Sequence, residues 1–414
     1  MKILIVHRSL YLDGGDTRYT IELTKLLTEK GHEVVIFNYG DHRNEDLGIR
    51  TISSHEPGGK AALSKFDGLG VVQKMRYGIS SAFSLQTYKK MRSLLRQERF
   101  DIVHIQSIHH TLTTSILLAM KEANVPVVWT LHDYRLICPE SHLFRDGEIC
   151  ELCVTGSLMN AITHKCKRDS FLLSSGAVLA SLADHITRCY EIPKKFIAPS
   201  NDLLRRFVSA GFEESRFEVV YHFVHASVNR ITSGEEKGIL YFGRFSREKG
   251  IEVLLRTSTL LRHRAFQLVG DGEMRGEIEE FCASSGSRNV TIYPFMDDRH
   301  LLEMISRAEL IVCPSQWAEV FGLTILESMA LGKIVIASAV GAIPEIIEHG
   351  VNGLLVQKFR EAEEWARSIE AILGNPMLGR QIRTNAIETA RIGFSRDAHY
   401  AKLVGIYESV LVAN

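Results

Sequence analysis

Two basic side chains in the second half of the chain are spaced to bind one anion. Arg244 and Lys249 lie in a glycine-bounded loop, 243–250, directly after the apolar stretch 238–242. A guanidinium can make two parallel hydrogen bonds to a phosphate, and an ammonium adds a compact charge. The loop therefore predicts a diphosphate site, although a solvated basic turn is the alternative that spacing alone leaves open.

Two glutamates frame a predicted helix start further along. An apolar strand ends at Cys313, Glu319 follows in the loop, and Glu327 lies in the second turn of a helix that opens near Gly322. The first amides of a helix lack internal partners and its dipole favours anions, so Gly322 and Leu323 suit a pyrophosphate. We expect Glu319 to contact a transferred sugar and Glu327 to accept hydrogen bonds from ribose hydroxyls.

Two glycine turns in this half need separate interpretations. The turn 268–276, with Gly270 at its centre, has the spacing GxGxxxG, and the next strand, 290–293, ends in Pro294 without an acidic residue. That departs from a dinucleotide fingerprint, so we interpret it as a tight turn near the nucleotide. The turn at Gly341 looks structural.

Candidate ligand contacts in the first half also follow predicted strands. Adjacent Gly14 and Gly15 let backbone approach a ligand closely. His132 and Asp133 follow the strand 126–130, and His104, His109 and His110 lie at or near the end of another strand. A structural role is the alternative for each, and for His109, His110 and Asp133 we predict only acceptor contacts.

Two series of apolar strands alternating with helical patterns must position these residues. The first predicts strands at 3–6, 33–37, 101–105 and 126–130, and the second at 238–242, 265–269, 290–293, 310–313 and 333–337. Strands that alternate with helices form parallel sheets, which bind ligands beyond their carboxyl ends. The sequence therefore predicts an α/β protein with two Rossmann-like parallel-sheet domains that face each other across a cleft.

Composition and patterning divide the chain as follows. We expect an acceptor-side domain over 1–226 with a cysteine-rich insertion at 134–170, a polar linker over 227–237, a donor domain over 238–395, and a C-terminal helix over 396–414 that crosses back onto the first domain.

Charge and hydropathy restrict the partners. Lys plus Arg (49) balances Asp plus Glu (49), so no overall charge favours nucleic acid. The apolar run at the N-terminus is too short for a signal peptide, which predicts a cytoplasmic protein. Segment 60–99 carries nine basic and two acidic residues with apolar ones between them. This pattern fits contact with the inner face of a membrane and equally a solvated helix face.

Four cysteines cluster in the insertion. Cys138, Cys150, Cys153 and Cys166 have the spacing C-x11-C-x2-C-x12-C. Four thiolates with one close pair are typical of a structural zinc site, and reduced thiols without metal are the alternative.

Taken together, these motifs resemble those of family 4 of the retaining glycosyltransferases, which have the GT-B fold. The resemblance rests on Arg244-x4-Lys249-Gly250, the Val-Gly-Asp-Gly turn, Ser315 with Glu319-x7-Glu327, and the Gly341 turn, in this order. It implies that Arg244 and Lys249 bind the donor diphosphate, Glu319 the donor sugar and Glu327 the ribose. It also implies that Gly14 and Gly15 lie near the donor phosphates and His132 beside the sugar.

The resemblance implies transfer from a nucleotide sugar to a hydroxyl with retention of configuration, and no metal is needed for this chemistry. The expected acceptor is a saccharide or a lipid-linked molecule of cell-surface polysaccharide biosynthesis. The alternatives are a nucleotide-sugar epimerase of the same fold and a non-catalytic protein that binds sugar nucleotides. One departure is that His222-Phe-Val-His225 replaces the Asn-Gly and Asp that the family commonly carries, which affects the expected hinge.

Overall fold

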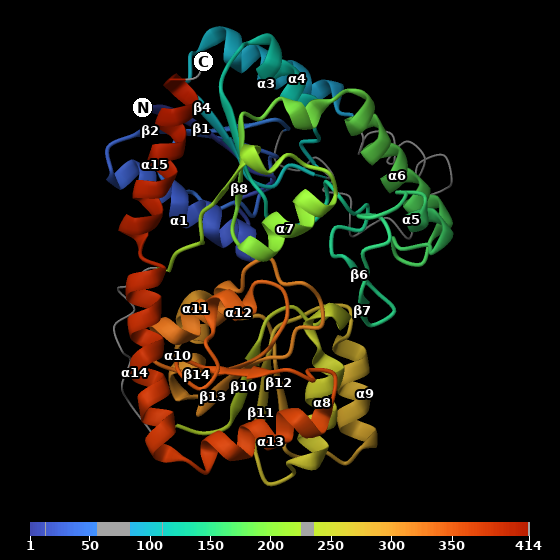
Figure 1. Cartoon of the computed structure of the whole chain (residues 1–414), viewed down its shortest axis with the longest axis vertical. Coiled ribbons are helices and arrows are strands. Elements are labelled where there is room, and N and C mark those ends of the chain that lie inside the picture. The colour runs from blue at the N-terminus through green and yellow to red at the C-terminus, as the bar shows by residue number, and fades with distance from the viewer. Residues whose placement is uncertain (13, 56–82, 110, 225–235, 413–414) are drawn as a thin grey trace. The chain divides into compact units, whose positions relative to one another are not determined.

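A computed structural model describes residues 1–12, 14–55, 83–109, 111–224 and 236–412. They form two compact units. The first comprises 1–143, 151–221 and the C-terminal 399–414, and the second comprises 144–150 and 222–398. Figure 1 labels the elements along the chain.

The first unit contains a seven-stranded parallel sheet with the order β3-β2-β1-β4-β5-β8-β9. The short apolar runs form its central strands because each is buried on both faces. Its strands are β1 (Lys2–Val6), β2 (Glu33–Asn38), β3 (Thr51–Ser53), β4 (Ile102–Ile105), β5 (Val127–Thr130), β8 (Lys195–Ala198) and β9 (Phe217–Val219). Its helices are α1 (Gly15–Glu29), α3 (Leu85–Gln97), α4 (Ser115–Glu122), α5 (Asn160–Thr163), α6 (Phe171–Ile186) and α7 (Asn201–Ser209).

The second unit contains a six-stranded parallel sheet with the order β12-β11-β10-β13-β14-β15. Its strands are β10 (Ile239–Phe242), β11 (Phe266–Val269), β12 (Val290–Tyr293), β13 (Leu310–Cys313), β14 (Ile334–Ser338) and β15 (Leu354–Val356). Its helices are α8 (Ile251–Leu260), α9 (Arg275–Ser284), α10 (Asp298–Arg307), α11 (Leu323–Ala330), α12 (Ile343–Ile346), α13 (Ala362–Leu373) and α14 (Pro376–Gly393).

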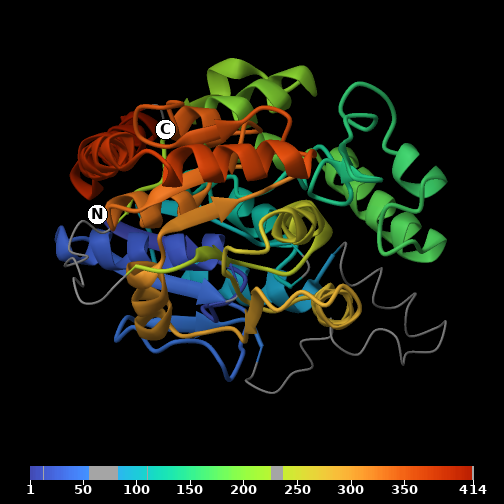
Figure 2. The ribbon, with the colours of Figure 1, turned by 90° about the horizontal axis from the view of Figure 1, so that it is seen from below.

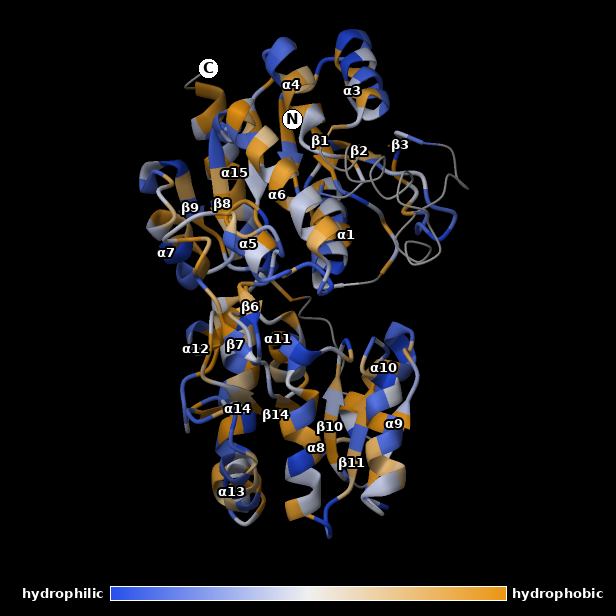
Figure 3. Cartoon of the chain, turned by 90° about the vertical axis from the view of Figure 1, so that its right-hand side faces the viewer, coloured by the Kyte–Doolittle hydropathy of each residue, from blue (hydrophilic) through white to orange (hydrophobic). Residues whose placement is uncertain are grey.

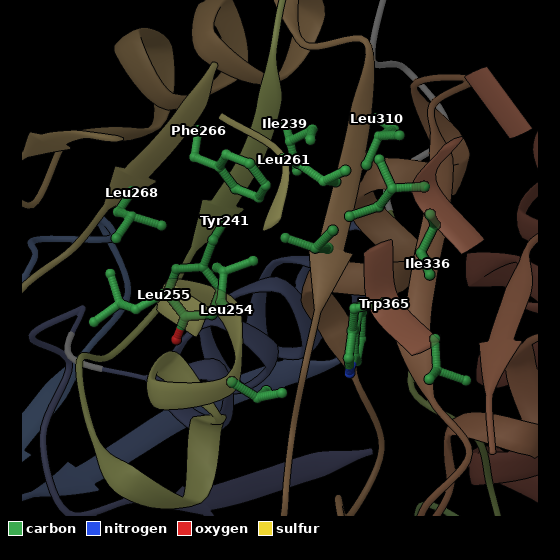
Figure 4. Close-up of a cluster of buried hydrophobic side chains, with 14 of the residues drawn as sticks. Ile239, Tyr241, Leu254, Leu255, Leu261, Phe266, Leu268, Leu310, Ile336 and Trp365 are labelled. Carbon is green, nitrogen blue, oxygen red and sulfur yellow. The ribbon is translucent and has the colours of Figure 1, made fainter. Parts of the chain in front are cut away.

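The core of the second unit lies between this sheet and its helices. Phe266 and Leu268 from β11 and Leu254 from α8 are buried in one cluster with Trp365 of α13, which is fully buried (Figure 4). The Trp365 indole N–H donates to the backbone oxygen of Phe359 at 2.9 Å, so its polar atom is satisfied inside the core.

The last helix, α15 (Arg396–Val412), supplies buried side chains to the first unit. His399 Nε2 accepts from the Tyr19 hydroxyl of α1 at 3.1 Å, and the Tyr407 hydroxyl lies 2.6 Å from Nδ1 of His104 in β4. These buried contacts place the end of the chain on the sheet with which the chain began.

The expected domain limits need two corrections. Residues 144–150 of the insertion, which contain the short hairpin β6 (Phe144–Arg145) and β7 (Glu148–Ile149), group with the second unit, whereas we expected all of 134–170 in the first. The second unit also begins at 222 rather than after the linker. Most of the predicted linker 227–237, namely residues 227–235, lies outside the described residues. Glu236, which belongs to the same predicted linker, forms an ion pair with Lys333 of the second unit.

Candidate functional site

Both sheets reverse their strand order at one point, and candidate residues lie there in each unit. The reversal falls between β1 and β4 in the first sheet and between β10 and β13 in the second. At such a point the loops beyond the carboxyl ends of the two strands diverge and leave a crevice, where ligands bind in open parallel sheets.

Beyond β10 and β13, Lys249 and Glu319 form an ion pair of 2.6 Å. The Ser315 hydroxyl donates to the same carboxylate oxygen at 2.5 Å. Glu319 is buried, which by itself raises its pKa, but the charge and hydrogen bond of Lys249 and the bond from Ser315 outweigh burial and hold that pKa below its usual range. Glu319 is thus an ionised carboxylate that its two partners hold in one orientation.

Trp317 completes this group, and the sequence analysis missed it. The Lys249 ammonium lies 5.0 Å from the centre of the Trp317 ring, a cation–π contact. The Trp317 side chain also helps to hold the pKa of Glu319 below its usual range. Its position between Ser315 and Glu319 was the available signal.

Gly341 holds the Glu319 loop through close backbone contact. Its φ is +58°, and a Cβ atom there would lie 2.4 Å from the backbone nitrogen of Glu319. Ala342 N–H donates to the Glu319 backbone oxygen at 2.8 Å. The Gly341 turn, expected to be structural, therefore positions a site residue.

Arg244 differs from its neighbour Arg247. Arg247 pairs on the surface with Glu252 at 2.8 Å and with Glu277 at 3.2 Å. Arg244 is exposed and forms no ion pair with any residue that the structure describes. Its guanidinium is thus available to an anion at the carboxyl end of β10.

The remaining predicted donor contacts lie on neighbouring loops. Helix α11 begins at Leu323 after Gly322, whose φ is +118°, and its first turn contains no acidic residue. Glu327 lies on this helix and is half-buried. Gly270 packs on the Arg244 loop so closely that a Cβ atom would lie 1.9 Å from the Gly243 backbone oxygen. The structure thus gives Gly270 a packing role.

In the first unit, Asp16 organises the corresponding point. Arg8, just beyond β1, donates to both Asp16 carboxylate oxygens at 3.3 Å, and the Ser107 hydroxyl beyond β4 donates at 2.8 Å. Burial alone raises the pKa of Asp16, but Arg8 and the nearby histidines reverse this and hold it far below its usual range. Sequence reasoning named Gly14 and Gly15 but missed Asp16 and Arg8, whose signal was their place after a strand.

Gly14 and Gly15 lie where α1 begins. Gly14 is the N-cap residue, with extended backbone, and Gly15 is the first residue of the helix. A Cβ atom on Gly14 would lie 2.9 Å from an oxygen of Asp16. Gly14 thus leaves room for the Asp16 carboxylate to lie against the backbone at the start of α1.

His132, at the end of β5, is held by a chain of buried polar groups. Its Nε2 donates to Gln106 Oε1 at 2.7 Å, given the assigned orientation of the amide. The Gln106 amide nitrogen then donates to His104 Nε2 at 3.0 Å, which leaves the His104 proton on Nδ1 to reach Tyr407. Burial lowers the pKa of His132 to about 4, so it is a neutral hydrogen-bonding group at pH 7.

The acceptor-side candidates Asp133 and His109 have separate partners. Asp133 accepts from the backbone N–H of Arg135 at 2.8 Å, and His109 packs on Trp129 with ring centres 5.7 Å apart. Burial raises the pKa of Asp133 and lowers that of His109 to about 3. His110 lies outside the described residues, as does most of the basic segment 60–99.

No metal site is formed by the described residues. Nowhere in the described ranges are three or more His, Cys, Asp or Glu side chains arranged to hold a metal ion. All seven cysteines are free thiols, and burial raises the pKa of Cys138. The zinc site of Cys138, Cys150, Cys153 and Cys166 stays a prediction.

Family models match both halves of this sequence. The model "Glycosyltransferase Family 4" matches residues 13–228, more than half of the chain, and "Glycosyl transferases group 1" matches 228–391. The chain belongs to glycosyltransferase family 4. The predicted family and the GT-B fold are both confirmed.

Relatives of this family 4 glycosyltransferase include an alpha-D-kanosaminyltransferase of Streptomyces kanamyceticus, 34% identical over 42% of this chain and 45% of that protein. The match thus spans less than half of that relative. A D-inositol 3-phosphate glycosyltransferase of Pseudarthrobacter chlorophenolicus is 27% identical over 93% of this chain and 88% of its own.

Solved structures share the fold of this glycosyltransferase along its whole length. HepE of Anabaena, determined in complex with UDP and glucose, superposes with a TM-score of 0.70 at 19% identity, covering 99% of this chain and 100% of the other. Sucrose-phosphate synthase of Thermosynechococcus elongatus gives 0.73 at 18% identity and covers 100% of both chains.

Proposed function

We propose that this glycosyltransferase takes its sugar from a nucleoside diphosphate sugar and transfers it to a hydroxyl group with retention of configuration. The observation that carries the proposal is the arrangement beyond β10 and β13. A buried carboxylate, Glu319, is oriented by Lys249 and Ser315 beside the exposed Arg244, which has no acidic partner among the described residues.

Each group suits one part of such a donor. Arg244 and Lys249 match the two charges of a diphosphate, and the first amides of α11 can donate to its oxygens. The fixed Glu319 carboxylate can accept from sugar hydroxyls, and Glu327 from those of ribose. The structures of HepE with UDP support a donor of this class.

In the proposed reaction the bond between the anomeric carbon and the diphosphate oxygen breaks while the acceptor oxygen forms a bond on the same face. The acceptor proton passes to the departing phosphate oxygen. Arg244, Lys249 and the helix amides stabilise the charge that grows on this phosphate, a form of electrostatic catalysis. The neutral His132 would contact the sugar by hydrogen bonding, and no metal is needed in this scheme.

The first unit offers a surface cavity of about 750 Å³ for an acceptor. Its lining includes Ser53 at the end of β3, Ser54 and His55 after that strand, and Lys89 and Lys90 on α3. Hydroxyls suit a saccharide, and two ammonium groups suit an anionic group such as the phosphate of a lipid-linked acceptor. We assign acceptors of this kind, from cell-surface polysaccharide biosynthesis, to the first unit.

A donor panel tests the proposal. Each nucleotide sugar is scored by thermal shift and by hydrolysis, and the anomeric configuration of the product is read by NMR. We expect Glu319→Gln to lower turnover about 100-fold or more, because its fixed charge is lost. Glu252→Gln, a surface change in the same unit, should leave turnover unchanged. Unchanged transfer by Glu319→Gln, or an inverted product, would contradict the proposal.

A further inference from the structure

Helix α6 carries its large apolar side chains on its solvent-exposed face, whereas a helix of a globular unit usually turns such side chains toward the core. Phe171, Leu179 and Ile186 are 63%, 64% and 81% exposed, and Leu172 and Leu182 are each more than a third exposed. Residues 171, 179, 182 and 186 recur at spacings that place them on one face of a helix. Figure 3 shows apolar residues repeated along the α6 ribbon.

The face of α6 that packs on the unit carries small residues instead. Ser174, Val178, Ala180 and Ser181 are buried. The buried hydroxyls are satisfied, because Ser174 accepts from the backbone N–H of Lys167 and Ser181 donates to the Ala177 oxygen. This reverses the usual pattern, in which the large apolar side chains face the core.

Basic side chains lie at the start of this helix. Lys165 and Arg168 are exposed and form no ion pair with any residue in the described part of the chain. Among the acidic residues nearby, Asp169 is exposed, and Asp184 is buried and accepts from the Tyr190 hydroxyl at 2.9 Å. Glu140 and Glu191 form ion pairs with Lys167 and Arg188. The exposed charge beside the apolar face is therefore net positive.

We propose that this face, formed by Phe171, Leu172, Leu179, Leu182 and Ile186 with Lys165 and Arg168 at its end, docks on an anionic lipid bilayer surface. Interfacial helices insert apolar side chains at the boundary between headgroups and acyl chains, while basic residues attract anionic headgroups. No helix in the described ranges is long and apolar enough to cross a membrane, so α6 would lie along the surface.

The size of the face disfavours a second copy of the chain as the occupant. A helix of 16 residues is about 24 Å long, and a face about 10 Å wide offers roughly 240 Å². Stable interfaces bury about 800 Å² on each partner. Figures 1 and 2 show α5 and α6, in green, at the margin of their unit.

Vesicle flotation of the full chain, with no sugar present, tests the inference separately from the proposed reaction. We expect binding to vesicles of phosphatidylcholine with phosphatidylglycerol, and binding about 10-fold weaker or less for the double variant Leu179→Asp, Ile186→Asp. Met377→Asp, at an equally exposed methionine of the second unit, is the matched control and should bind as the wild type does.

Charge reversal at the basic residues gives an independent test of the same inference. Lys165→Glu with Arg168→Glu should weaken binding to the anionic vesicles and leave weak binding to pure phosphatidylcholine unchanged. The inference is overturned if the wild type ignores anionic vesicles or if the Leu179 and Ile186 variant binds equally well. It is also overturned if light scattering shows a dimer that this variant dissolves, which would make a second copy the occupant.

Discussion

Each strand-order reversal contains an ion pair, Arg8 with Asp16 in the first unit and Lys249 with Glu319 in the second, but the two units hold the side chain expected to contact the sugar in different ways. In the second unit an ion pair, Lys249 with Glu319, fixes the candidate site. In the first unit the groups around His132 are mostly neutral, and Gln106 and His104 are joined by hydrogen bonds as far as Tyr407 of α15. A buried charge is costly to leave without its partner, whereas a neutral network is weakened more gradually. The two units should therefore respond differently to mutation and to acid.

The largest effect is expected from Lys249→Met. It leaves the buried Glu319 carboxylate without its cation, so we expect the pKa of Glu319 to rise, the free energy of unfolding to fall by about 3 kcal/mol, and turnover to fall about 100-fold or more. Urea unfolding and donor hydrolysis measure these changes. Arg247→Met in the same loop removes only exposed pairs and should cost less than about 1 kcal/mol. Equal losses in both variants would break the comparison.

Acid should destabilise the first unit before the second. Burial lowers the pKa of His7 and His104 to about 3 and of His132 and His399 to about 4, from 6.5 in the unfolded chain. The unfolded chain binds these protons first, so stability falls as the pH drops below about 6.5 and continues to fall toward pH 4.

Each histidine that is protonated only in the unfolded chain lowers the free energy of unfolding by about 1.4 kcal/mol for every pH unit below its pKa in the unfolded chain. The Glu319 pKa is lowered instead, so its contribution is present above pH 4.5 and is lost only at lower pH. Hydrogen exchange between pH 7 and pH 5, corrected for intrinsic rates, should show peptides of the first unit opening earlier. Simultaneous opening of both units would contradict this.

The smallest effect is expected from Tyr407→Phe. It leaves the Nδ1 proton of the buried His104 without its acceptor and should cost about 1–3 kcal/mol. Tyr400→Phe removes a hydroxyl of the same helix that lies 2.8 Å from Nε2 of the partly exposed His32, and it should cost less. Thermal unfolding of the two variants, measured side by side, compares the stability lost with a buried hydrogen bond of α15 and with a partly exposed one.

Much of the fold could be predicted from the apolar runs. The predicted strands at 3–6, 290–293 and 310–313 match β1, β12 and β13 to within a residue. The strands β3, β9 and β15 were missed because three residues are too few to show a period. The start of helix α1 at Gly15 could not be predicted, since its polar first turn lacks the apolar spacing that indicates a helix.

Site residues were predictable where they follow a strand within a known motif, as Lys249 and Glu319 do. Their contact was not, because it depends on β10 and β13 being neighbours in the sheet although they are separated by β11 and β12 in the sequence. Asp16 and Gln106 were missed for a similar reason, since their partners Ser107 and His132 follow other strands. Buried polar pairs of this kind are specified by topology rather than by local sequence.

Because α15 packs on the first unit, some buried contacts of that unit can form only late in the synthesis of the protein. The partners of Tyr19 and His104 are residues 399 and 407, which leave the ribosome only after all of the second unit has been made. During translation the buried polar groups of Tyr19 and His104 therefore lack these partners until the last helix has been made. The first unit thus cannot complete its buried hydrogen bonds before residues 399–407 are available.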